Sequence, residues 1–179
     1  MALPEGASGA TPSVVIAVRS LKTPIGTVHV AASPHRVVSV ELPRPRGDRG
    51  LERWVRERFA PSPELPALSA AVTQLREYFA HTRRIFDLAL DPAGTEFQRR
   101  VWERVQAIPY GETSTYGHIA DAIGNAHLAR TVGVAVRANP MPIIIPCHRV
   151  IGADGSLAGY SGGVRRKIWL LRHEGVLLA

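Results

Sequence analysis

The residues best suited to chemistry stand together near the C-terminal end of the chain. Cys147 is the one cysteine among 179 residues, and it follows an apolar segment, 141–145, that ends at Pro146. A histidine and an arginine come next, His148 and Arg149. A thiol near an imidazole and a cation can lose its proton and act as a nucleophile. A lone cysteine after an apolar segment is also commonly a small core residue, so the local pattern leaves both interpretations open.

The supply of cysteine and histidine excludes several other kinds of chemistry. One cysteine forms no disulfide within the chain and offers no cysteine-rich zinc site. The seven histidines are scattered without the close spacing of metal ligands. We therefore expect neither a metal nor another cofactor. The absence of disulfides fits a cytoplasmic protein.

Charge and hydropathy limit the classes of partner that the protein could bind. The chain carries 22 basic and 15 acidic residues, a net charge of +7, which favours polyanions such as DNA through phosphate contacts. Many arginine-rich proteins nevertheless bind nothing acidic, so charge alone leaves the partner open. No apolar run approaches the roughly 18–20 residues of a membrane span, and we expect no membrane partner. Residues 1–13 are rich in Ala, Gly, Ser and Pro and are predicted to be disordered.

The first half of the chain predicts a small mixed domain, 14–91, with an antiparallel sheet. Short apolar runs predict strands in four places: residues 14–19, 27–32, 37–42 and 85–90. Apolar residues at helical spacing predict helices over 51–59 and 68–81. A turn is expected at 23–26 and a loop over 42–50. The breaker Asp91-Pro92-Ala93-Gly94 places the domain boundary after residue 91.

The second half, 92–179, predicts a mostly helical domain that must position the cysteine. Thr95 and Gln98 have the spacing of a capping box at the start of a helix that ends at Pro109. Short helices are expected over 114–123 and 126–138, with Gly124 ending the first and Asn125 capping the second. They resemble a helix-turn-helix, which gives a winged-helix-like domain and an α/β (α+β) fold overall. A terminal helix is predicted over 165–174.

The second of these short helices carries mostly small residues. This composition is typical of close packing against a neighbour, and it would also suit a slim helix that enters a narrow groove. The pattern alone favours packing.

Together these segments resemble the O6-alkylguanine-DNA alkyltransferase family. The signature is Pro146-Cys147-His148-Arg149-Val150. Further segments match the family in order and spacing: Phe97-Gln98-X-X-Val101-Trp102, 108–113, 114–116, 129–133, Asn139-Pro140, 160–163 and His173-Glu174-Gly175. The resemblance is dense over residues 94–176. It is loose in the first half, where it rests on 23–26 and the helix before the boundary.

The resemblance implies a role for each residue of a candidate catalytic group. Cys147 would accept the alkyl group by in-line displacement. His148 would take the thiol proton through a water, and Glu174 would orient His148. Tyr116 would donate a proton to the departing guanine ring, and Asn139 would brace the turn beneath the site. Without the resemblance, Tyr116 would be assigned to the helix-turn-helix core and Glu174 to a solvated helix end.

The same resemblance implies a DNA-binding surface. The family binds double-stranded DNA in the minor groove and rotates the damaged guanine out of the stack. Arg130 would fill the gap that the base leaves, although local sequence alone is equally consistent with a surface arginine. The other residues expected at this surface are Ser114, Ala129, Thr131, Gly133 and Arg137. Thr131 departs from the alanine that is frequent in the family.

A substrate pocket is implied as well. Ser161 would donate a backbone hydrogen bond to O6, and the Val150 carbonyl would accept one from the exocyclic amine. The full set of expected pocket residues is Trp102, Pro142, Val150, Ala158, Tyr160 and Ser161.

The implied function is direct-reversal repair by a stoichiometric, self-inactivating methyltransferase. A single chain would move the alkyl group, chiefly methyl, from O6-alkylguanine or O4-alkylthymine irreversibly to Cys147, acting as a monomer. Two alternatives stay open. One is a DNA-binding module without chemistry, which Cys147 argues against. The other is a cysteine hydrolase or redox enzyme, which the absence of a second cysteine argues against.

Overall fold

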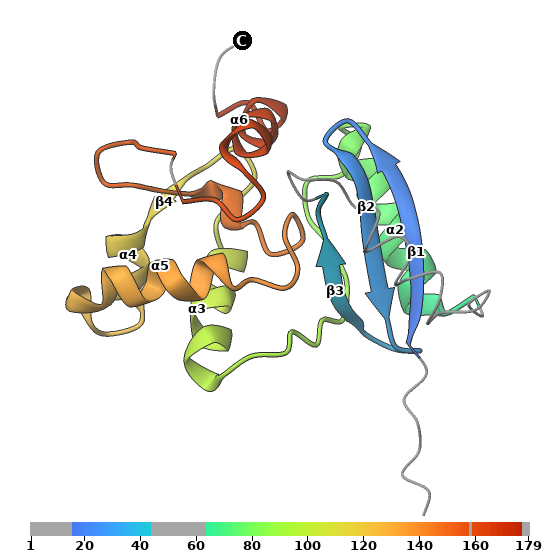
Figure 1. The fold of residues 1–179 in the computed structure, drawn as a ribbon, viewed down its shortest axis with the longest axis horizontal. Coiled ribbons are helices and arrows are strands. Elements are labelled where there is room, and N and C mark those ends of the chain that lie inside the picture. Colours follow the sequence, from blue (N-terminus) through green and yellow to red (C-terminus); the bar gives the residue numbers. More distant parts are fainter. Residues whose placement is uncertain (1–15, 44–63, 158, 177–179) are drawn as a thin grey trace, which may run out of the picture.

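The computed structural model describes residues 16–43, 64–157 and 159–176. Two parts lie side by side (Figure 1): a three-stranded sheet with one long helix, and a helical part that contains residues 96–176. The predicted α+β fold class is therefore confirmed. Three predicted features lie wholly or mostly outside the described residues: the disordered residues 1–13, the loop over 42–50 and the helix over 51–59.

The sheet consists of β1 (Ala17–Thr23), β2 (Gly26–Ala32) and β3 (Val37–Glu41) in the order β1-β2-β3, all antiparallel. The predicted turn at 23–26 is confirmed, because Thr23 pairs with Gly26 across it. Gly26 has a φ of 108°, and a Cβ there would meet Pro43 at 2.6 Å, so only glycine fits. The first strand begins later than predicted and continues to this turn.

Helix α2 (Pro66–Phe79) covers the sheet with an apolar stripe at helical spacing. The buried residues of this stripe are Leu68, Ala71, Val72, Leu75 and Tyr78.

The predicted strand over 85–90 is wrong. Only Leu90 forms a bridge, to Val37, while Ile85 is largely exposed. The Gln74 side chain bonds both backbone groups of Asp87, at 2.8 Å each, and so occupies the groups that a neighbouring strand would need. The segment is an extended connection instead.

In the helical part, α3 (Glu96–Gln106) begins with the predicted capping box between Thr95 and Gln98. The helix-turn-helix consists of α4 (Tyr116–Ala122), a 3-10 turn η1 (Ala126–Leu128) capped by Asn125, and α5 (Ala129–Arg137). The first helix starts two residues later than predicted, because β4 (Ser114–Thr115) pairs in parallel with β5 (Val150–Ile151).

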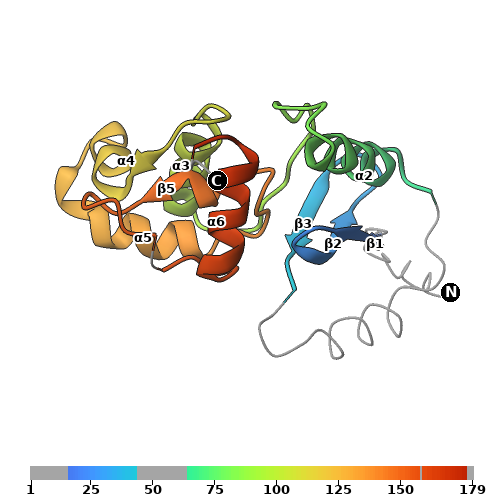
Figure 2. The same ribbon diagram turned by 90° about the horizontal axis from the view of Figure 1, so that it is seen from above.

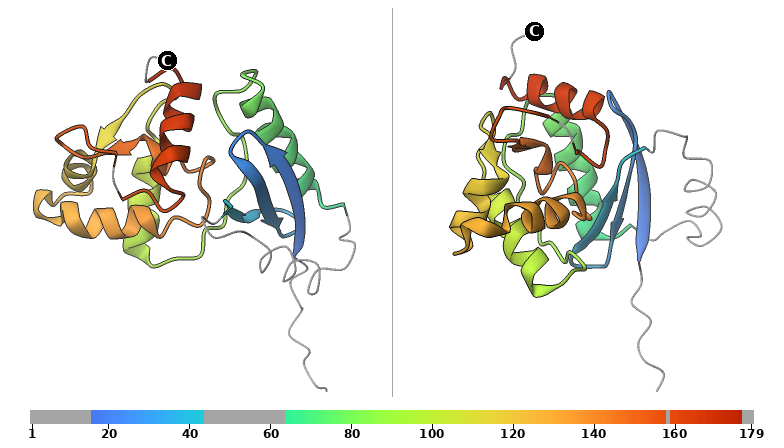
Figure 3. Two further views of the ribbon diagram at one scale, coloured as in Figure 1. Left: turned by 45° about the horizontal axis from the view of Figure 1, so that its top comes forward. Right: turned by 60° about the vertical axis from the view of Figure 1, so that its left-hand side comes forward.

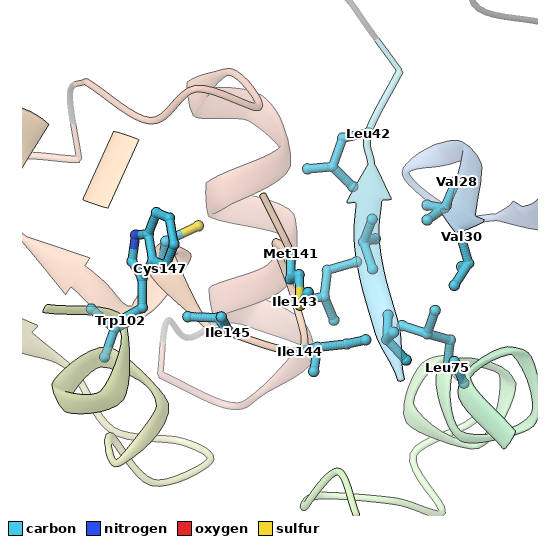
Figure 4. Packing of buried hydrophobic residues seen from close by; sticks show 14 of the residues in the cluster. Val28, Val30, Leu42, Leu75, Trp102, Met141, Ile143, Ile144, Ile145 and Cys147 are labelled. Carbon is cyan, nitrogen blue, oxygen red and sulfur yellow. The ribbon is translucent and has the colours of Figure 1, made fainter. Parts of the chain in front are cut away.

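The final helix, α6 (Val164–His173), lies on the side of the helical part that faces the sheet and α2 (Figures 2 and 3). Between the two parts runs the buried apolar segment 141–145. Figure 4 shows Met141, Ile143 and Ile144 between the sheet and Cys147. The Val40 amide donates to the Pro140 carbonyl at 2.8 Å, which joins this segment to the edge of the sheet.

Candidate active site

Cys147 opens a short 3-10 helix, η2 (Cys147–Arg149), and its side chain is buried. The segment before it, 141–145, forms a tight turn, with Ile143 at a φ of 77°, an unusual conformation for a β-branched residue. Asn139 holds both ends of this turn: its Nδ2 donates to the Ile145 carbonyl at 2.8 Å, and its Oδ1 accepts from the Met141 amide at 2.9 Å. Asn139 thus positions the chain that presents the thiol.

His148 and Glu174 form a buried pair next to the cysteine. His148 Nε2 lies 2.9 Å from Glu174 Oε1, and both side chains have an exposed fraction of 0%. An imidazole that donates from Nε2 to a carboxylate keeps its lone pair on Nδ1. Nδ1 is buried and has no hydrogen-bond partner among the described residues. The arrangement can therefore accept a proton at Nδ1 while Glu174 stabilises the resulting cation.

Glu174 also anchors an arginine. Arg149 Nε donates to Glu174 Oε2 at 2.7 Å and its Nη2 donates to Oε1 at 2.9 Å, while Nη1 donates to the Ile108 carbonyl at 2.6 Å. Burial by itself raises the pKa of Glu174, but hydrogen bonds and charge from His148 and Arg149 outweigh it and lower that pKa to about 2. Glu174 is therefore ionised at neutral pH.

The acid-base state of the cysteine and histidine follows from their burial. Burial raises the pKa of the Cys147 thiol, with the Asn139 side chain and the charge of Lys167 acting in the opposite direction. Burial lowers the pKa of His148, although Glu174 acts against this. At neutral pH the pair is accordingly a neutral thiol and a neutral imidazole, and the thiol needs a base in order to react.

A groove of about 850 Å³ opens beside this site, along the helix-turn-helix. Tyr116 lies in its wall, half-buried. Burial raises the pKa of Tyr116, and so does the negative charge of a nearby Cys147 thiolate, while Arg137 lowers it. The phenol is thus a protonated donor between the groove and the cysteine.

Four of the residues expected to bind DNA line this groove with Tyr116: Ala129, Arg130, Gly133 and Arg137. The other two do not. Thr131 is exposed elsewhere on α5, and Ser114 is half-buried in β4, where it pairs with Val150. The small residues of α5 include one that packs closely, since Ala135 is buried against the core. Gly133 lines the groove, and a Cβ at this position would lie 3.8 Å from the Tyr116 ring.

The expected pocket residues are more dispersed. Pro142 and Ser161 line a second, smaller groove together with Asn139. The Val150 carbonyl already accepts a hydrogen bond from Lys167 Nζ at 2.6 Å, and the Tyr160 hydroxyl is buried without a hydrogen-bond partner among the described residues.

The two remaining residues expected in the pocket are Trp102 and Ala158. Trp102 is a packing residue, 2% exposed, whose indole donates to the Ala135 carbonyl at 2.8 Å and joins α3 to α5. Ala158 lies outside the described residues.

Three features of the site escape sequence reasoning. Arg149 points to Glu174 and not to the thiol, and the cation near the thiol is the fully buried Lys167. Tyr78, from the other part of the molecule, donates to Glu174 Oε1 at 2.8 Å. The one available signal in the sequence was Lys167, a lysine near apolar residues of α6, since a lysine that is buried there requires a partner.

Among the described residues, no cluster of three or more His, Cys, Asp or Glu side chains could hold a metal ion. The helices of residues 16–43, 64–157 and 159–176 are all too short or too polar to cross a membrane.

Comparison with known proteins places both parts of the chain in one family. Residues 16–92 match the family model described as 6-O-methylguanine DNA methyltransferase, ribonuclease-like domain. Residues 96–176 match the model described as 6-O-methylguanine DNA methyltransferase, DNA binding domain.

Individual relatives agree. The methylated-DNA–protein-cysteine methyltransferase of Mycobacterium tuberculosis (strain ATCC 25618 / H37Rv) is 44% identical over 156 residues, which cover 87% of this chain and 90% of the relative. The protein of that name from Methanosarcina acetivorans is 54% identical over 105 residues, 59% of this chain and 67% of its own.

Among solved structures, Mycobacterium tuberculosis O6-methylguanine methyltransferase aligns with a TM-score of 0.76 and 42% identity, over 92% of this chain and 96% of the other. Mycobacterium tuberculosis OGT in complex with DNA aligns with a TM-score of 0.75 and 44% identity, over 88% and 91%. With family models matched along both parts and relatives similar over nearly the full length, the chain belongs to the 6-O-methylguanine DNA methyltransferase family.

Proposed function

We propose that the chain repairs DNA by direct reversal, moving the alkyl group, chiefly methyl, from O6-alkylguanine in double-stranded DNA irreversibly to Sγ of Cys147. O4-alkylthymine is the second proposed substrate, because it too carries its alkyl group on an exocyclic oxygen of the base. The observation that carries the proposal is the single cysteine beside a buried His148–Glu174 pair, next to a groove along a helix-turn-helix. The names of the relatives and the DNA complex of one of them support it.

The transfer proceeds in one displacement. The thiol of Cys147 is neutral because burial raises its pKa, so its proton must leave as sulfur attacks. His148 takes that proton, through a water as in the family, and Glu174 stabilises the imidazolium. The new bond joins sulfur to the alkyl carbon, and the bond between that carbon and O6 breaks.

The guanine leaves as an anion and needs a proton. Tyr116 supplies it from the groove side, since its raised pKa keeps the phenol protonated at neutral pH. The product thioether has no acidic proton and is a poor leaving group, so each molecule reacts once.

The DNA surface is the groove along α5. The damaged base must rotate out of the stack to reach a thiol that is 3% exposed. Arg130 is exposed at this groove and would replace the base, with Ala129 and Gly133 allowing a close approach of the DNA. The net charge of +7 supports phosphate contacts.

Three further proposals concern the whole chain. We place the domain boundary between residues 91 and 92, with residues 14–91 supporting the active domain. We also propose that the protein acts as a monomer, because one chain carries the cysteine, the His148–Glu174 pair and the groove. The cytoplasm is the proposed location, since a single reactive thiol must stay reduced.

A titration of the protein against excess DNA containing O6-methylguanine tests the proposal. The product should plateau at one methyl group per protein, with the added mass on the peptide that contains Cys147. The variant Cys147→Ser should transfer nothing while its DNA affinity is unchanged. Repeated turnovers would instead favour a hydrolase, and DNA binding without an adduct would favour a binding module.

A further inference from the structure

Tyr78 belongs to the last turn of α2, on the sheet side of the molecule, yet it reaches the candidate active site. Its hydroxyl donates to Glu174 Oε1 at 2.8 Å, and its side chain is 0% exposed. Its ring packs against Phe86, Tyr110 and His173, with centroids 4.9 to 6.3 Å away. This packing determines the direction of the hydroxyl, so the donor has a defined aim.

Glu174 Oε1 is a shared acceptor. It accepts from Tyr78, from His148 Nε2 at 2.9 Å and from Arg149 Nη2 at 2.9 Å, whereas Oε2 accepts from Arg149 Nε at 2.7 Å. Donors that bond to the same oxygen share the electron density of its lone pairs. A hydroxyl on Oε1 therefore reduces the negative charge that this oxygen presents to His148.

We propose that Tyr78 is a positioning residue for alkyl transfer: its hydroxyl holds Glu174 Oε1 in place and limits how strongly this carboxylate attracts a proton on His148. The inference rests on the proposed function, because it assumes that His148 is the base. It assigns a specific task in the reaction to the part of the molecule formed by residues 16–92.

The groups around the pair come from four elements. Around Glu174 lie Tyr78 of α2, Tyr110 of the turn before β4, and His148 and Arg149 of η2. The charge of Lys167 on α6 also lowers the pKa of His148. On the same helix, the charges of Glu174 and His148 both affect the pKa of His173. Of these groups, only Tyr78, His148 and Arg149 donate to Oε1 among the described residues.

The test is the pH dependence of the reaction with free O6-benzylguanine, which avoids any effect on DNA binding. The rate falls at acid pH as His148 becomes protonated and can no longer act as a base. In Tyr78→Phe, Oε1 attracts the imidazolium more strongly, so the pKa of His148 rises. The midpoint of the acid limb should move up by roughly 0.5 pH unit, with a smaller change at alkaline pH.

A second variant keeps the ring of Tyr78 and should shift the midpoint of the acid limb in the opposite direction. Site-specific 3-fluorotyrosine at position 78 has a more acidic phenol and is a stronger donor, so the midpoint should move down. This variant also covers the case in which Tyr78→Phe does not fold. Tyr110→Phe is the matched control: its hydroxyl donates to the His173 carbonyl at 3.0 Å in the same cluster, and its loss should leave the midpoint in place.

Each outcome decides between the two proposals. An unshifted midpoint in both position-78 variants, or a loss of rate that is equal at every pH, would overturn the role of Tyr78 while the Cys147 adduct still forms. A wild-type protein that forms no adduct on Cys147 would overturn the proposed function itself.

Discussion

At the scale of single residues, Glu174 does more than orient a histidine. It is the counter-charge of a buried arginine, and it accepts hydrogen bonds from His148, Arg149 and Tyr78. Removing one partner of a buried ion pair leaves the other charge uncompensated, at a typical cost of about 3–5 kcal/mol. A substitution at Glu174 would therefore lower stability as well as activity, which makes it a poor probe of catalysis and a good probe of folding.

The first prediction concerns stability and pH. The folded pKa of Glu174 is about 2, below its ordinary 4.5, so its ionisation stabilises the folded state above the unfolded pKa. That contribution, about 3 kcal/mol, should be lost as the pH falls from 4.5 towards 2. Urea unfolding of the wild type across this range measures it. Glu174→Gln should be less stable at neutral pH and should show a shallower decline. Parallel declines in the two proteins would contradict the prediction.

At the scale of elements, short and irregular segments carry the site. The 3-10 helix η2 carries both Cys147 and His148, and the turn before it depends on Asn139 and on Ile143 with a positive φ. The helix α5 presents its small residues and Arg130 to the groove. Each of these elements is stable only because it is buried against α3, α6 or the sheet, since helices this short are marginal alone.

The second prediction concerns α5. If Arg130 replaces the rotated base, Arg130→Ala should slow repair of duplex DNA at least about tenfold, because extrusion of the base costs a few kcal/mol. Reaction with free O6-benzylguanine, which requires no extrusion, should be unchanged. Rates on both substrates, measured for this variant and for Arg104→Ala on the exposed side of α3, test it. An equal loss on the two substrates would indicate misfolding instead.

At the scale of the whole molecule, the two parts are joined beside the smaller groove, which Ser161 lines. Arg166 spans them: its Nε donates to the Ile25 carbonyl at 3.0 Å and its Nη1 donates to the Gly162 carbonyl at 2.8 Å. Leu42 lies close behind Gly162, where a Cβ would meet it at 2.8 Å. The loop that carries Ser161 is therefore held from the sheet side.

The third prediction concerns this connection. Arg166→Ala should loosen the loop at residues 160–163 and raise the concentration of free O6-benzylguanine needed for half-maximal rate several-fold, with the maximal rate little changed. The loss of two hydrogen bonds should lower the free energy of unfolding by about 1–3 kcal/mol. Saturation kinetics and urea unfolding measure both effects. Arg165→Ala, at the exposed neighbouring position, is the control, and an identical result for the two variants would refute the connection.

Much of this protein follows from its sequence. The capping residues Thr95 and Asn125, the turn at 23–26 and the stripe of α2 depend on local spacing, and all are confirmed. The motif around Cys147 and its companions in family order indicated the family, because many short matches at consistent spacing rarely coincide by chance. The extended segment 85–90 shows the limit, since strand formation depends on whether a distant partner is available.

The resemblance implied that Glu174 contacts His148, and the tertiary structure alone decided that Arg149 and Tyr78 contact it as well. His148 and Arg149 are neighbours in sequence, but the turn of η2 directs both to a carboxylate 25 and 26 residues away. Tyr78 is separated from Glu174 by 96 residues and reaches it only because α2 and the end of α6 pack together. Burial sets the protonation of Cys147 and His148, whereas hydrogen bonds and charge from His148 and Arg149 overcome burial and keep Glu174 ionised; all of these depend on the packed molecule. Local sequence specifies the reactive groups, whereas their pKa values depend on burial and on contacts between residues that are far apart in the chain.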